Sequence, residues 1–182
     1  MNSAVQTDWL KPRPVRAVAM GAIFLCGLWL SPRHLLPFTA AFGLLLIALA
    51  WIDLDTFRLP DPLTFGTAAL GGLMMAMRLQ DAWVQHLLAG AGALAGFVLL
   101  EVVYRKFRGR DGLGRGDAKL FGALGLWVGP LGLAPLLLVA SASGLVAALL
   151  LQAVGRYTGR LAFGPWLALG GWTVWCAGNR LL

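Results

Sequence analysis

The chain has 182 residues, of which 59% are hydrophobic and 13% are charged, about half of the charged content of roughly 25% in a typical soluble domain. This composition excludes an ordinary soluble domain, and the apolar residues fall in blocks of roughly 15–22, close to the length that crosses a hydrocarbon core of about 30 Å. The formal charge of +7 is concentrated in short segments between these blocks, which is typical of topology control and lipid headgroup contact rather than of nucleic-acid binding. We therefore predict an all-α, polytopic membrane bundle in a lipid bilayer, with no nucleic acid as partner.

Seven apolar segments are expected to form transmembrane helices joined by short polar connections. They cover about residues 15–30, 36–52, 63–77, 83–104, 118–133, 134–154 and 161–178. The first follows basic residues, as the apolar part of a signal peptide does, but no small-residue cleavage site comes after it, so we interpret it as a retained span. Residues 1–182 are then expected to form one integral-membrane domain.

Two of the connections contain acidic residues. One is DLDTFRLPDP at residues 53–62, where Pro60 and Pro62 interrupt the helix. The other is RKFRGRDGLGRGDAK at residues 105–119. Because Lys and Arg are retained on the cytoplasmic side, the charge distribution predicts a cytoplasmic N-terminus, with both acidic connections on the cytoplasmic face.

Few polar groups are available for chemistry. His34 and His86 lack neighbouring carboxylates or cysteines and are interpreted as interfacial structural residues. The sequence contains no G-x-S-x-G or H-E-x-x-H motif, and GLGRG follows a helix rather than a strand, so serine hydrolysis, a zinc site and nucleotide binding are not expected. Cys26 and Cys176 form no C-x-x-C pair and are expected to pack in the core. We predict neither a metal nor a cofactor.

Two aspartates are placed to meet. Asp53 ends the second expected span and Asp117 begins the fifth, at the same membrane face. Two carboxyl groups in a partly dehydrated site do not ionise together readily, so one holds a proton while the other acts as a base, a pair that can activate water toward a peptide carbonyl. The alternative from the residues alone is that each is a helix cap or interfacial anchor. A third acidic residue at this face, Glu101, is spaced to pair with Arg105 one helical turn on.

Three stretches together resemble the type IV prepilin peptidases, in the right order over about residues 40–175. IDLDTFRLPD at residues 52–61 resembles their first signature, an Asp seven residues before a Pro. GLGRGDAKL at residues 112–120 resembles their second, G-x-G-D followed by a basic residue. Phe163-Gly164-Pro165 and the apolar run after it resemble the final span of the family.

The resemblance implies an intramembrane aspartic endopeptidase with Asp53 and Asp117 as its catalytic pair. Its substrates would be type IV prepilins or type II secretion pseudopilins, whose basic leader is cut at the cytoplasmic face of the bacterial inner membrane. Supporting roles fall on the other signature residues, which are Asp55, Pro60, Gly114, Gly116 and Lys119. Asp55 rivals Asp53 for the first catalytic position, but only Asp53 has the family's distance to Pro60. The two glycines are expected to allow backbone conformations that other residues adopt only at a cost.

The chain departs from the family mildly at residues 109–112, where a Glu is common before the Gly, and more clearly in its N-terminal part. Many members carry an N-terminal cytoplasmic insert with paired cysteines, associated with methylation of the new N-terminus. No such cysteine pair is present, so we expect peptidase activity without methyltransferase activity. Two alternatives stay open: another GxGD-type intramembrane protease, such as a preflagellin peptidase or a signal-peptide-peptidase relative, and a non-enzymatic small transporter or assembly subunit. The sequence makes no prediction of oligomeric state.

Overall fold

The computed structural model describes residues 13–78, 82–108, 114–155, 159 and 161–178. Within these ranges the chain forms helices and no strand, as predicted. The helices are α1 (Arg13–Leu30), the short 3₁₀ helix η2 (Arg33–Leu35), α2 (Leu36–Thr56), α3 (Asp61–Arg78), α4 (Trp83–Arg108), α5 (Arg115–Ala153) and α6 (Gly164–Gly178). The basic N-terminal segment before residue 13, residues 109–113 and most of the 156–160 connection lie outside the described residues.

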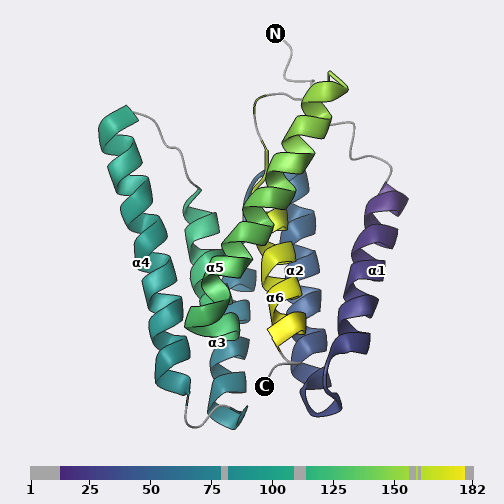
Figure 1. Cartoon of the computed structure of the whole chain (residues 1–182), viewed down its shortest axis with the longest axis vertical. Helices are drawn as coiled ribbons and strands as arrows, with labels where there is room; N and C mark the ends of the chain where they lie inside the picture. The colour runs from purple at the N-terminus through teal and green to yellow at the C-terminus, as the bar shows by residue number, and fades with distance from the viewer. Residues whose placement is uncertain (1–12, 79–81, 109–113, 156–158, 160, 179–182) are drawn as a thin grey trace.

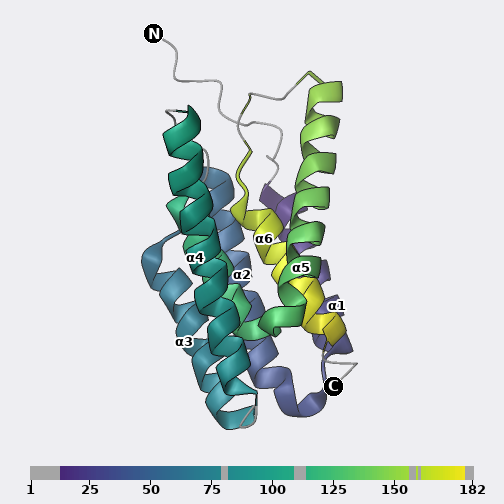
Figure 2. The same cartoon turned by 60° about the vertical axis from the view of Figure 1, so that its left-hand side comes forward.

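The helices run up and down in one bundle (Figures 1 and 2). The α2–α3 connection and the first residues of α5 and α6 lie toward one end, at the top of Figure 1. The η2 turn and the α3–α4 connection lie at the other end. This alternation brings the two acidic connections to the same end of the bundle, as the sequence predicts.

The helix α5 covers the fifth and sixth expected segments and turns sharply at Gly129. Gly129 has φ 66° and ψ −175°, a backbone conformation that favours glycine. One arm of α5 runs away from the end that carries the acidic connections, and the other returns toward it (Figure 2). The boundary therefore lies at Gly129-Pro130 and not at residues 133–134 as expected.

A hydrogen bond from α4 supports this turn. Pro130 has no N–H and cannot donate to the carbonyl of Leu126, its normal helical acceptor. His86 Nδ1 lies 2.9 Å from that carbonyl oxygen. Since a carbonyl only accepts, Nδ1 carries the hydrogen and donates. His86 therefore supplies a donor to this carbonyl at the point where the helix turns.

Three described segments are long and apolar enough to cross a membrane by length and composition. These are Arg33–Thr56, Trp83–Phe107 and Arg115–Ala153. Large apolar side chains also face outward, among them Trp29 at 83% exposure and Leu131 at 92%, which suits contact with lipid. The expected number of seven crossings stays a prediction.

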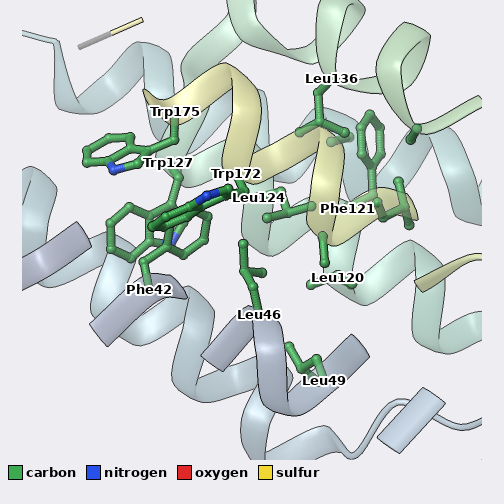
Figure 3. Close-up of a cluster of buried hydrophobic side chains, with 14 of the residues drawn as sticks. Phe42, Leu46, Leu49, Leu120, Phe121, Leu124, Trp127, Leu136, Trp172 and Trp175 are labelled. Atoms are coloured by element: carbon green, nitrogen blue, oxygen red, sulfur yellow. The ribbon is translucent and has the colours of Figure 1, made fainter. Parts of the chain in front are cut away.

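The core contains aromatic and leucine side chains of α2, α5 and α6 (Figure 3), together with Met74 and Met75 of α3 and Phe97 of α4. Phe42 stacks on Trp127 with ring centroids 4.0 Å apart, and Trp175 meets Trp127 edge-on at 5.1 Å. Trp127 Nε1 donates to the Thr67 carbonyl of α3 at 3.0 Å. These contacts hold α2, α3, α5 and α6 in fixed relation, and so position the ends of α2 and α5 that carry the acidic residues.

The two cysteines differ in their environment. Cys176 is buried in this core, as expected. Cys26 is exposed on α1, so the expectation of core packing is wrong for this residue. The physical reason is the position of α1 at the edge of the bundle (Figure 1), where, among the described helices, it packs against α2 and α6.

Candidate active site

Asp53 lies in the last turn of α2 and is only 5% exposed. The helix ends at Phe57, which adopts a left-handed conformation with φ 53° and donates its N–H to the Asp53 carbonyl at 2.8 Å. A left-handed residue at this position is a common helix terminator. The chain then turns to Pro60, whose carbonyl accepts the N–H of Thr64 at 3.1 Å and so begins α3. The signature from Asp53 to Pro60 therefore covers the end of α2 and the connection that leads into α3.

Asp117 lies in the first turn of α5. Its N–H donates to the Gly114 carbonyl at 3.0 Å, and no side chain caps the helix. A carboxylate in a first helical turn is stabilised by about 0.3–1 kcal/mol through the helix dipole. The helix dipole therefore favours the carboxyl group of Asp117 at the N-terminus of α5, although the rest of this helix is apolar.

The two motif glycines provide space. A Cβ on Gly114 would lie 2.9 Å from Asp117 Oδ2, and one on Gly116 would lie 3.1 Å from Leu59 Cβ. Gly114 has φ −70°, and Gly116 is not among the described residues with positive φ. The expectation that these glycines supply unusual backbone conformations is therefore wrong. They let the carboxyl group of Asp117 and the α2–α3 connection approach the start of α5.

Asp53 and Asp117 line one cavity of about 350 Å³. Its walls come from the α2–α3 connection and the start of α5, and the lining residues are Asp53, Phe57, Arg58, Leu59, Asp61, Gly114, Arg115, Gly116 and Asp117. The carboxyl group of Asp53 is close enough to that of Asp117 to act on it electrostatically. The structure thus brings together the two aspartates singled out in the sequence.

A third segment reaches this site from the end of the chain. The backbone N–H of Gly164, the first residue of α6, donates to Asp53 Oδ2 at 3.0 Å in a buried position. A hydrogen bond to a charged group contributes about 1.5–3 kcal/mol, more than the helix dipole alone. Sequence reasoning placed Phe163-Gly164-Pro165 in the final span but did not assign it to the site.

Lys119 and Asp61 form an ion pair beside the cavity, with Lys119 Nζ 2.6 Å from Asp61 Oδ1. Asp61 is the first residue of α3, so the pair joins the starts of two helices. Lys119 also lies over the Phe65 ring, 5.9 Å from its centroid. Lys119 therefore lies beside the site, and its ion-pair partner Asp61 is one of the residues that line the cavity.

Two further ion pairs lie near the site and involve α4 and α1. Arg115 Nε lies 3.3 Å from Glu101 Oε1, so Glu101 contacts the G-x-G-D segment. Arg16 Nη1 lies 2.9 Å from Asp55 Oδ1. Asp55 is not among the residues that line the cavity, which separates it from Asp53 although both lie at the end of α2.

In the described part of the chain, no group of three or more His, Cys, Asp or Glu residues is arranged to hold a metal ion.

Residues 40–149 match the Type IV leader peptidase family. The chain belongs to this family. Two similar proteins are each named prepilin leader peptidase/N-methyltransferase. The one from Dickeya chrysanthemi is 42% identical over 165 residues, which cover 87% of this chain and 57% of that protein. The one from Neisseria gonorrhoeae is 41% identical over 140 residues, which cover 75% and 47%.

The chain therefore spans about half the length of the curated relatives it matches. No solved structure matches it. The resemblance inferred from the two aspartate signatures is confirmed at the level of the family, since both signatures fall inside the matched range.

Proposed function

We propose that the chain is a membrane-embedded aspartic endopeptidase that removes the basic leader of type IV prepilins or type II secretion pseudopilins. The observation that carries this proposal is the meeting of Asp53 and Asp117 at one cavity, although they lie on different helices. Membership of the leader peptidase family and the names of the relatives support the substrate class. The expected absence of methyltransferase activity stays a prediction.

The chemistry requires only the two carboxyl groups and water. One ionised aspartate takes a proton from a water molecule that lies between the pair and a peptide carbonyl. The other, protonated aspartate donates to the carbonyl oxygen as negative charge develops there. The cavity of about 350 Å³ leaves room for an extended peptide segment beside the carboxyl groups.

The proposed setting is the bacterial inner membrane, with the site at the cytoplasmic face. Arg58 and Arg115 line the cavity with the aspartates. Lys119 pairs with Asp61, and Arg16 pairs with Asp55 at the end of α2. Lys and Arg near the ends of spans are retained in the cytoplasm. The N-terminus of α1 lies at this same end and would be cytoplasmic.

The proposal is tested by co-expression of the full chain with a type IV prepilin in a host without its own leader peptidase. We expect mass spectrometry to detect a pilin shortened by its leader with the wild-type chain, and the full-length prepilin with Asp117→Asn. Asp55→Asn is the matched control, because it changes a carboxylate of the same helix outside the cavity, and it should retain cleavage. Leader removal that persists in both Asp53→Asn and Asp117→Asn would refute the proposal. A preflagellin presented in the same way tests the related protease alternative.

A further inference from the structure

The two carboxyl groups of the site have different hydrogen-bond environments. Asp53 Oδ2 accepts the N–H of Gly164 at 3.0 Å. Among the described residues, none donates a hydrogen bond to the carboxyl group of Asp117. An N–H donor stabilises the ionised form of a carboxyl group over its protonated form. The two aspartates are therefore not equivalent before substrate binds.

The other influences on the pair do not reverse this difference. Asp117 lies in the first turn of α5 and Asp53 contacts the first residue of α6, so a helix dipole favours charge at each of them. Burial opposes charge at both aspartates, and the proximity of the pair opposes a second charge. Arg58 and Arg115 line the same cavity, as does Asp61, which is paired with Lys119. In the described part of the chain, no cation lies within ion-pair distance of Asp53 or Asp117.

Gly164 also sets the position of the Asp53 carboxyl group by its lack of a side chain. A Cβ at residue 164 would lie 2.6 Å from Asp53 Oδ2 and 3.1 Å from both Asp53 Cγ and Leu59 Cδ2. Any other residue would push the carboxyl group away from the α6 N–H. The next residue, Pro165, has no N–H to replace the donor. The contact therefore depends on glycine at this position.

We propose that Gly164 is a positioning residue that makes Asp53 the ionised member of the pair and leaves the shared proton on Asp117. This rests on the proposed peptidase function. Asp53 then takes a proton from water while the water oxygen bonds to the peptide carbon, and Asp117 gives its proton to the carbonyl oxygen. When the C–N bond breaks, Asp53 returns its proton to the departing amine, and a hydroxyl proton of the intermediate restores Asp117. Atoms and protons balance, and the pair ends as it began.

The test uses a reagent that distinguishes the two forms without any cleavage. An apolar carbodiimide, dicyclohexylcarbodiimide, reacts with protonated carboxyl groups in membrane proteins. The full chain in lipid nanodiscs is treated with it near neutral pH, and the label is located by peptide mass spectrometry. We expect Asp117 to carry at least tenfold more label than Asp53. Equal label on the two, or more on Asp53, would overturn the proposal without use of any variant.

Gly164→Ala is the matched perturbation. Its methyl group should displace the Asp53 carboxyl group from the N–H, so the label on Asp53 relative to Asp117 should rise severalfold. Gly178→Ala is the control, because it lies in the same helix with no atom within 4 Å of the added Cβ, and its ratio should equal the wild-type ratio. An unchanged ratio in Gly164→Ala would also overturn the proposal.

Cleavage assays keep this proposal separate from the proposed function. With a prepilin as substrate, Gly164→Ala should lower kcat by roughly 10–100-fold and leave KM nearly unchanged, since the peptide still binds while the base is misplaced. If the wild-type chain cleaved no prepilin but carried its label on Asp117, the proposed function would fail and the unequal pair would stand. If the wild-type chain cleaved the prepilin but carried its label on Asp53, the proposed function would stand and the assignment of the proton to Asp117 would fail.

Discussion

Lys119 Nζ lies 2.6 Å from Asp61 Oδ1, and this contact joins the second turn of α5 to the first residue of α3 across 58 residues of sequence. The two helix starts that it connects also border the cavity between Asp53 and Asp117. The ion pair is half-exposed, with side chains 38% and 54% accessible. A pair this exposed contributes little to stability. We therefore expect it mainly to hold the starts of α3 and α5 in position relative to each other.

The first prediction concerns this ion pair. Lys119→Met should change the free energy of unfolding by less than about 1 kcal/mol, measured by thermal unfolding in detergent. Cleavage should fall by roughly fivefold, the rate equivalent of about 1 kcal/mol, because the start of α5 is less firmly held. Lys119→Arg should retain most of the rate. A loss as complete as that of Asp117→Asn would show instead that Lys119 takes part in the reaction.

The second prediction concerns a close backbone contact of α4 with α5. A Cβ on Gly125 would lie 2.8 Å from Gly90 Cα and 2.9 Å from the Ala89 carbonyl oxygen, which are backbone atoms that cannot move aside without displacing the helix. Gly125→Ala should lower the free energy of unfolding by about 1–3 kcal/mol, the usual cost of overpacking. Gly92→Ala, on α4 with no atom within 4 Å, is the control and should cost nothing. Equal midpoints for the two variants would mean that α4 and α5 do not pack as described.

The third prediction concerns the turn in α5. His86→Ala leaves the Leu126 carbonyl without its donor and should cost about 1–3 kcal/mol. In a Pro130→Ala background, residue 130 regains an N–H, so the same His86→Ala change should cost less. Thermal unfolding of the four chains forms a double-mutant cycle. An identical cost in both backgrounds would mean that His86 stabilises the turn only by packing against Gly129.

The helices and the proximity of Asp53 to Asp117 were predictable because both follow from the order of apolar and polar residues along the chain. Apolar length defines the spans, and the alternation of spans sends the two acidic connections to the same end of the bundle. The turn at Gly129 carried a local signal as well, since Gly-Pro breaks a helix. The prediction misplaced that boundary because the apolar run continues through it without a polar residue.

The contacts around the aspartates were not predictable, because they depend on which helices become neighbours. Gly164 lies 111 residues after Asp53. It contacts Asp53 through a backbone N–H, which the identity of the side chain at residue 164 does not indicate. Local helical spacing suggested Arg105 as a partner for Glu101, and the structure brings Arg115 of another helix to it. Close glycine contacts such as Gly90 with Gly125 decide the neighbours, and hydrophobic patterning does not indicate which glycines meet.

In the proposed mechanism Asp53 and Asp117 act as one unit, and a kinetic comparison of four chains tests whether they do. Wild type, Asp53→Asn, Asp117→Asn and the double variant are purified in lipid, and the rate of leader removal from a prepilin is measured for each. Each single variant should lose at least about 10²–10⁴-fold in rate, and the double variant should be no slower than either one, because removing one member already removes the pair. Substantial cleavage by either single variant, or loss of cleavage in Asp55→Asn with Asp53→Asn still active, would show that Asp53 and Asp117 are not the catalytic pair.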